Sequence, residues 1–416
     1  MTKNLRKAYR TIVEDHFAPR MELSFIDGDT RQTLAYEKVT WPTSDGEAKG
    51  LRYGENPDQE AALYRLVDSG VTLEEVDLVG PGLGLVCDAR LIQSGKHPGK
   101  INLTDVDAAL LILRYLTDRP ACAVMKHNNP CGVAQAETLC DAFTRALAAD
   151  RIAAFGGAVV LDRACDLDTA KAIAGGYVEV VAAPSYEEGS VATLSERKNL
   201  RIVEIPRIDK LERFADVRFL ELKSLLDGGV VVQTSFACQP RGPEDLQIAE
   251  AKRAGETVRI ARTPTDEEMA DLLFGWFVEA GVTSNSVLYV KDRATVAIGT
   301  GEQDRVGVAR IARDKAYRNT GERLAFDRFA TSYDELSEDQ QLEIDADVAE
   351  RRGGLIGAAM VSDAFFPFPD GVKVGLREGI SAVIQPGGSL NDAAVIDACN
   401  EADATMVFTG QRSFKH

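Results

Sequence analysis

The stretch AVMKHNNPCGVA, residues 123–134, sets a wholly apolar run directly against a polar corner. The run extends from Ala121 to Met125, and Lys126 and His127 follow at once. A short, uninterrupted apolar run is typical of a strand that is covered on both faces, as in α/β proteins. In such sheets, functional side chains commonly follow the carboxyl end of a strand. The stretch therefore predicts an α/β sheet with a lysine–histidine pair at its edge, next to a tight polar turn, NNPCG.

The same alternation continues outward along the chain, because short β-rich runs alternate with longer amphipathic segments. This pattern favours the α/β class. The other expected strands are 158–161, 178–182, 201–205, 229–233, 287–291, 295–299, 358–361, 381–385 and 405–409. Two helices are expected to start at Thr104 and Thr265, because each threonine is followed three residues later by an acidic residue. A third, acidic helix is expected over 337–354.

The composition limits the classes of partner. The chain has 65 acidic and 48 basic residues and a formal charge of −17, which disfavours binding to nucleic acid. A few arginines could still hold a small anionic substrate. The seven cysteines include no CxxC, the N-terminal stretch is charged throughout, and no apolar run approaches the roughly 20 residues that span a bilayer. These features predict a reduced, cytoplasmic protein without membrane association.

The Lys126–His127 pair is the first candidate for chemistry. A cation beside an imidazole favours the neutral imidazole, which can accept a proton near pH 7. A solvated strand end is the alternative interpretation. In LRYGENPDQ (51–59), Arg52 precedes a turn and is a candidate phosphate ligand, although a surface ion pair would also explain it. Gly156, in FGGAVVL, suggests a close approach of backbone to a ligand, or a plain turn.

The C-terminal half adds further candidate stretches. Asn285 stands at a strand start, and Arg305 follows a glycine-flanked turn that enters a helix. SDAFFPFPDG (362–371) holds three phenylalanines that either cover a core or stack on a ligand. The last residues, RSFKH (412–416), are either disordered or docked.

Seven motifs occur together in the order and approximate spacing of one family: LRYGENPDQ, KHNNPCGVA, FGGAVVL, SNSVLYVKD with GTGEQDRV, SDAFFPFPDG, QPGGS and RSFKH. Over residues 45–416 the chain resembles the aminoimidazole carboxamide ribonucleotide (AICAR) formyltransferase domain of the bifunctional purine-biosynthesis protein. With only about 45 residues ahead of LRYG, it resembles that domain without the cyclohydrolase domain.

The resemblance implies two cytidine-deaminase-like α/β/α lobes with mixed sheets. The expected division is an N-terminal extension (1–45), a first lobe (46–205), a connecting segment (206–263) and a second lobe (264–416). It also implies a homodimer with active sites at the interface, and transfer of the formyl group of 10-formyltetrahydrofolate to the 5-amino group of AICAR. No catalytic metal is expected, and a separate IMP cyclohydrolase is left open as a partner.

The resemblance also assigns roles to individual residues. His127 resembles the general base, Lys126 the cation that stabilises the transition state, and Asn285 a group that orients the substrate. The implied AICAR-binding residues are Arg52, Tyr53, Gly156, Glu179, Arg305, Phe365 and Arg412. The implied folate-side residues are Val306, Asp370, Ser389, Leu390 and His416.

The chain departs from the family pattern at several places. Asp58 and Asp304 replace residues that are more often His and Ser, Glu179 replaces Asp in some relatives, and Pro369 removes a cation and a backbone donor on the folate side.

Two alternatives were weighed against formyl transfer. A zinc deaminase needs H-x-E and P-C-x-x-C; the chain has no H-x-E, and Pro130-Cys131 is followed by Val133-Ala134 where the second cysteine would stand. The other alternative is a non-catalytic nucleotide- or folate-binding subunit that works with a separate IMP cyclohydrolase. Binding alone does not require the Lys126–His127 pair, so formyl transfer is favoured.

Overall fold

A computed structural model describes residues 5–43, 46–69, 71 and 80–416 of the 416-residue chain. Its contacts divide the chain into two compact units, and each is described by itself. Unit 1 comprises Met1–Leu110 and Gly156–Ala237, and unit 2 comprises Leu111–Phe155 and Cys238–His416. The lobe boundaries expected from the resemblance (46–205 and 264–416) stay a prediction.

Unit 1 contains a small mixed sheet built from the predicted apolar runs. Strands β9 (Ala158–Leu161), β10 (Val180–Ala183) and β11 (Arg201–Glu204) are parallel, and β6 (Arg90–Gln93) runs antiparallel to β11. Helices α5 (Leu167–Ala174) and α6 (Ser190–Ser195) connect the parallel strands in sequence. Every residue of β9 and β10 is buried, which agrees with strands covered on both faces.

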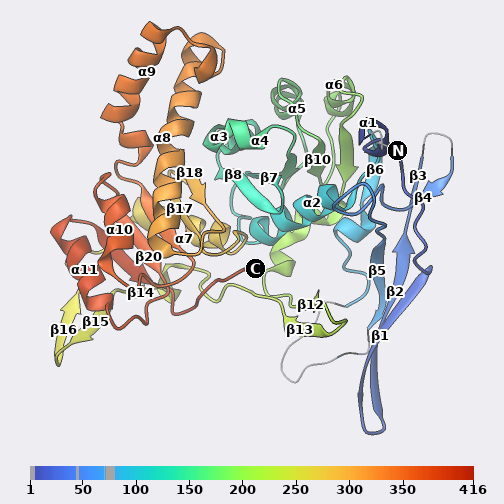
Figure 1. The fold of residues 1–416 in the computed structure, drawn as a ribbon, viewed down its shortest axis with the longest axis horizontal. Helices are drawn as coiled ribbons and strands as arrows, with labels where there is room; N and C mark the ends of the chain where they lie inside the picture. The colour runs from blue at the N-terminus through green and yellow to red at the C-terminus, as the bar shows by residue number, and fades with distance from the viewer. Residues whose placement is uncertain (1–4, 44–45, 70, 72–79) are drawn as a thin grey trace. The chain divides into compact units, whose positions relative to one another are not determined.

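Unit 1 also holds an antiparallel sheet that the sequence did not predict. It consists of β1 (Arg20–Asp27), β2 (Thr30–Val39) and β5 (Leu63–Ser69), and it extends as a long ribbon in Figure 1. Its strands are mostly half-buried or exposed, so they lack a strong apolar signal. The remaining elements of unit 1 are α1 (Leu5–Ala8), β3 (Trp41–Pro42), β4 (Ala48–Lys49), η1 (Val86–Asp88), η2 (Pro206–Phe214), β12 (Leu220–Ser224) and β13 (Val230–Thr234).

Unit 2 is organised around a larger mixed sheet with the strand order β14-β21-β20-β19-β17-β18-β8-β7. Strands β19, β20 and β21 are parallel to one another, and the other pairs are antiparallel. The strands are β7 (Ala121–Lys126), β8 (Asn129–Gln135), β14 (Gln247–Ile248), β17 (Val287–Lys291), β18 (Ala294–Gly299), β19 (Ala359–Ser362), β20 (Ala382–Gln385) and β21 (Thr405–Phe408). The predicted α/β class with mixed sheets is confirmed.

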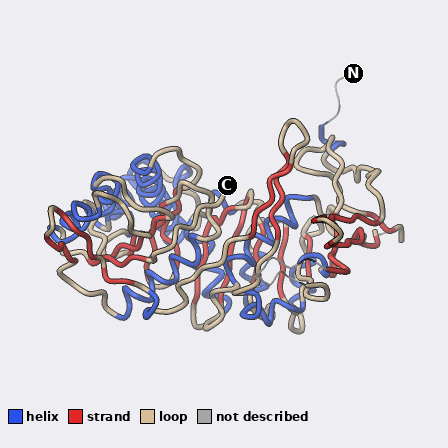
Figure 2. The backbone as a smooth tube through the Cα atoms, turned by 90° about the horizontal axis from the view of Figure 1, so that it is seen from below, coloured by secondary structure: helices blue, strands red, loops and turns tan. Residues whose placement is uncertain are grey.

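Helices cover both faces of this sheet, as the side chains of β17 show. Tyr289 packs in one core with Val308 and Ala312 of α8 (Arg305–Phe329). The alternate residues Leu288 and Val290 lie against Gly275 of α7 (Asp266–Glu279). Since successive side chains of a strand point to opposite faces, α7 and α8 lie on opposite sides of the sheet. Figure 2 shows helices on both sides of strands. The other elements of unit 2 are α3 (Leu139–Ala149), α4 (Arg151–Ala154), η3 (Pro243–Asp245), β15 (Glu250–Arg253), β16 (Glu256–Arg259), η4 (Tyr333–Glu335), η5 (Arg352–Gly354), α10 (Pro369–Leu376) and α11 (Asp392–Glu401).

Two of the three helix predictions are confirmed. Thr265 and Glu268 form a reciprocal capping box at the start of α7. The predicted acidic helix is α9 (Glu338–Glu350), which Ser337 caps and which packs beside α8 as a helical hairpin (Figure 1). The helix predicted to start after Thr104 is wrong at its start. Helix α2 spans Lys100–Leu113, and the Thr104 hydroxyl donates to the Ile101 carbonyl inside it.

In the described part of the chain, every helix is too short or too polar to cross a lipid bilayer.

Candidate functional site

The Lys126–His127 pair sits on the turn of a tight β-hairpin in unit 2. Lys126 ends β7 and pairs with Asn129, the first residue of β8, so the loop contains only His127 and Asn128. Both loop residues have positive φ, 56° and 60°, which is the pattern of a type I′ turn. The prediction of a turn over NNPCG is therefore wrong in extent: Pro130, Cys131 and Gly132 belong to a buried strand.

This turn leaves the imidazole exposed and fixes the lysine. His127 is exposed, whereas Lys126 is half-buried and its Nζ donates to the Phe155 carbonyl at 2.8 Å. Gly132 lies so close to α3 that a Cβ there would stand 2.0 Å from the Ala146 carbonyl oxygen. The close packing of β8 on α3 therefore fixes the position of the hairpin.

Two further contacts attach the hairpin to neighbouring segments of unit 2. The Asn129 side-chain oxygen accepts from the Thr283 backbone N–H at 2.9 Å. The Lys415 Nζ donates to the Asn128 carbonyl at 3.2 Å, and the Lys415 backbone pairs with Ser284 in both directions. The C-terminal residues are therefore docked, and the hairpin turn, the 281–285 segment and the C-terminus form one cluster.

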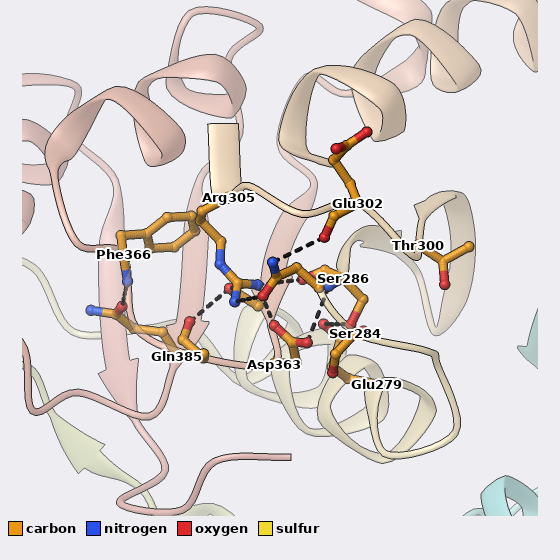
Figure 3. A network of polar contacts seen from close by, with 12 residues as sticks. Glu279, Ser284, Ser286, Thr300, Glu302, Arg305, Asp363, Phe366 and Gln385 are labelled. Atoms are coloured by element: carbon orange, nitrogen blue, oxygen red, sulfur yellow. Dashed lines mark hydrogen bonds and ion pairs between the residues drawn. The ribbon is translucent and has the colours of Figure 1, made fainter. Parts of the chain in front are cut away.

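Asn285 and Arg305 lie together in a polar network. Figure 3 shows Arg305 in this network beside Ser286 and Asp363. Arg305 is the first residue of α8, and its Nη2 donates to the Asn285 side-chain oxygen at 2.9 Å. The Asn285 side-chain nitrogen donates to the Glu302 carbonyl, also at 2.9 Å. A cis peptide bond joins Ser284 to Asn285. The amide of Asn285 is thus held at both ends.

Acidic side chains complete this network. The Arg305 Nη1 contacts the Ser286 carbonyl, the Ser362 hydroxyl and the Asp363 carboxylate, whose side chain is 0% exposed. Glu279 is also fully buried and accepts from the Ser286 hydroxyl at 3.0 Å. Burial, and then the charge of Asp363, raise the pKa of the Glu279 carboxyl well above its usual range. The folded environment therefore favours the protonated, uncharged form of Glu279.

In unit 1, Arg52, Tyr53 and Glu179 belong to a second polar cluster. Arg52 is 5% exposed, donates to the Tyr53 hydroxyl at 2.9 Å and lies over its ring. The Glu179 carboxylate accepts from Arg201, whose side chain is 1% exposed, at 3.0 Å. The Arg201 Nη2 donates to the His97 carbonyl. Burial, with the nearby Arg52 and Arg201 charges adding to it, lowers the pKa of His97.

Gly156, in the same unit, has a φ of 75° and donates its N–H to the Tyr177 carbonyl at 2.9 Å. Glycine adopts this conformation more readily than other residues, so the backbone conformation alone explains the glycine at position 156.

Two of the predicted folate-side residues line one cavity of unit 2. Val306 and Asp370 share a cavity of about 590 Å³ with Phe368, Pro369 and several basic residues. Pro369 is the first residue of α10. The N–H of a first helical residue has no partner within the helix, so proline is tolerated there. Ser389 and Leu390 do not line this cavity, although Asn391 beside them donates to the Pro367 carbonyl.

The remaining predicted residues are at the surface of unit 2. Phe365 is 39% exposed, and Arg412 and His416 are exposed. Both C-terminal residues flank Phe414: the Arg412 guanidinium lies 4.2 Å from its ring centroid, and the His416 ring packs against its edge.

Comparison with known proteins gives a consistent family match. The family described as "AICARFT/IMPCHase bienzyme" matches residues 6–315, about three quarters of the chain. The chain belongs to this family. It is 39% identical over 376 residues to the "Bifunctional purine biosynthesis protein PurH" of Dinoroseobacter shibae, covering 89% of this chain and 60% of the relative. The PurH of Magnetococcus marinus is 35% identical over 412 residues, covering 99% and 67%. This family member thus spans about three fifths of the length of the first of these relatives.

The structure adds residues that sequence reasoning missed. Asp363, Glu279 and Arg201 are buried ionisable groups that contact predicted site residues or their partners. Asp363 directly follows an apolar strand and so carried the same signal as Lys126, whereas Arg201 opens a strand and did not carry it. Glu279 ends an apolar helix and carried no such signal.

Proposed function

We propose that this protein transfers the formyl group of 10-formyltetrahydrofolate to the 5-amino group of AICAR in purine biosynthesis. The observation that carries the proposal is the exposed imidazole of His127 on a two-residue turn, directly beside the anchored Lys126. Membership of the AICARFT/IMPCHase family and the PurH relatives support the pathway.

The residue types fit the proposed reaction. The acceptor amine is a weak nucleophile because its lone pair is delocalised into the imidazole carboxamide. His127 takes a proton from this amine as the new N–C bond forms. The tetrahedral intermediate carries an oxyanion, which the Lys126 ammonium stabilises. As the bond between the formyl carbon and the folate nitrogen breaks, that nitrogen takes a proton from Lys126, and the proton held by His127 restores the starting charges. Asn285 orients the substrate, since Arg305 and Glu302 hold its amide in place.

The binding groups are proposed as the resemblance implies them. Those proposed to bind AICAR are Arg52, Tyr53, Gly156, Glu179, Arg305, Phe365 and Arg412. Val306, Asp370, Ser389, Leu390 and His416 are proposed for the folate side. The described residues contain no cluster of metal-ligating side chains. The protein is proposed to act as a homodimer with active sites at the interface.

The test is a spectroscopic assay of tetrahydrofolate release with AICAR and 10-formyltetrahydrofolate. His127→Ala and Lys126→Ala should each lower kcat by about 10²–10⁴, the range for loss of a positioned acid–base or oxyanion group. Glu401→Gln, at an exposed carboxylate, is the matched control. Equal turnover in the wild type and both variants would contradict the assigned roles. Tight binding of both substrates without turnover would favour the non-catalytic subunit that works with a separate cyclohydrolase.

A further inference from the structure

A second cavity of unit 2, distinct from the candidate site, is lined by basic side chains. It measures about 600 Å³ and lies among α3, α4, α8 and the β17–β18 turn. Its basic lining residues are Arg145, Arg151, Lys291, Arg323 and Arg351, against the two carboxylates of Asp292 and Asp327. This excess of positive charge occurs in a chain whose formal charge is −17.

Three of these guanidinium groups have no hydrogen bond or ion pair to the described residues. They belong to Arg151, Arg323 and Arg351; Arg151 instead lies 3.7 Å from the ring centroid of Phe326. By contrast, Arg328 of the same helix α8 pairs with two carboxylates of α9. The cavity therefore presents donors that the protein itself does not satisfy.

The surroundings of these groups are partly desolvated. Burial, reinforced by the charge of Arg351, lowers the pKa of Arg323, while Asp327 opposes the change. Burial also lowers the pKa of Arg151, opposed by Glu322 and Asp327. Arg323 and Arg351 thus repel each other, and a bound anion would relieve this repulsion.

The lining also contains two polar side chains of α8 whose hydrogen-bond partners lie in the protein. Asn319 and Thr320 are buried, and they bond to the carbonyls of Ala149 and Gly353. The lining includes Ala294 at the start of β18, and Ala294 pairs with Ala134 of β8. His127 stands at the opposite end of β8, so the two sites use different ends of the same strand.

We propose that this cavity binds a small polyanion that carries two or more phosphate groups. Guanidinium groups pair bidentately with phosphate oxygens, and the three that lack a hydrogen bond or ion pair to the described residues offer donors for more than one phosphate group. A volume of about 600 Å³ lies within the usual range of small-molecule sites.

The test is isothermal titration calorimetry of the full chain with inorganic pyrophosphate at low salt, with ADP as a second ligand. The wild type should bind at least one of them, and Arg323→Gln and Arg351→Gln should each weaken that binding at least tenfold. Arg213→Gln removes an exposed arginine of unit 1 and is the matched control. Tighter binding of ADP would identify a nucleotide, and tighter binding of pyrophosphate an inorganic polyanion.

Several outcomes would overturn the proposal. They are the absence of binding at millimolar ligand, unchanged binding in both cavity variants, and equal weakening in the Arg213→Gln control. Thermal unfolding of each variant, followed by fluorescence, separates a lost contact from a lost fold. A further adverse result is that Arg323→Gln dissociates an oligomer while pyrophosphate binding persists, since the cavity would then hold a second copy of the chain. None of these measurements depends on formyl transfer.

Discussion

Asp363→Asn should strongly destabilise unit 2. The side chains of Arg305 and Asp363 are 7% and 0% exposed, so the substitution leaves the guanidinium charge buried without its counter-charge. Both carboxylate oxygens accept hydrogen bonds, one from Arg305 and one from the Ser286 N–H, and an amide offers only one acceptor. Breaking a buried pair by removing one partner costs about 3–5 kcal/mol, so we expect a loss in this range.

The two tryptophans of the chain make the measurement specific to unit 2. Trp41 lies in unit 1, and Trp276 is fully buried in α7 of unit 2. In a Trp41→Phe background, urea unfolding followed by Trp276 fluorescence therefore reports on unit 2. The midpoint should fall with little change in the slope.

Two further variants make the result interpretable. Glu401→Gln, at an exposed carboxylate, should leave the midpoint unchanged. The double variant Arg305→Met/Asp363→Leu should lose less stability than Asp363→Asn, because no unpaired charge stays buried. A loss below about 1 kcal/mol for Asp363→Asn would refute the reasoning, since surface pairs have values of that size.

Three further predictions follow from local contacts. Thr265→Ala removes the cap of α7 and should cost about 1 kcal/mol in urea unfolding; Thr263→Ala, at an exposed position just ahead of the helix, is the comparison, and an equal effect would contradict the role of the cap. Gly132→Ala places a methyl group 2.0 Å from the Ala146 carbonyl and should cost about 1–3 kcal/mol, so an unchanged melting temperature would contradict the close packing. Glu279→Gln should change the pH dependence of stability. Folding raises the pKa of the Glu279 carboxyl, so the wild type loses stability as the pH rises above the pKa of about 4.5 in the unfolded chain. The variant has no carboxyl at this position and does not show this loss. The difference in melting temperature should therefore shift in favour of the variant between pH 5 and pH 8, and a constant difference would show that the group is not responsible.

The parts of the fold that the sequence predicted are those with a local signal. All ten expected strands are present with small shifts at their ends, because short apolar runs such as Val287–Lys291 identify buried strands without knowledge of their partners. The β1–β2–β5 sheet was missed because its residues are half-exposed and mixed in polarity. Strand β8 was missed because Pro130 and Gly132 favour turns, and only the packing on α3 explains why a glycine is buried there.

In the candidate site, too, the positions of residues were predictable from local sequence and their long-range contacts were not. Lys126, His127 and Arg305 stand in recognisable local motifs, so their positions at the ends of elements were predictable. Their partners were not, because contacts such as Arg305 with Asp363 join residues 58 positions apart. The burial that raises the pKa of Glu279 comes from the packing of the whole network, and the residues next to Glu279 in the sequence do not reveal it.

The two-residue loop between β7 and β8 restricts the insertions and deletions that this part of the chain can accept. Surface loops ordinarily accept added or deleted residues, but one extra residue after His127 would either bulge outward or shift the pairing of the hairpin. A shift by one position exchanges the two faces of a strand, and both faces of β8 are buried, so the shift would place a larger side chain where Gly132 packs against the Ala146 carbonyl. The length of this loop is therefore constrained by the core beneath it, and chain-length variation should be concentrated in other loops.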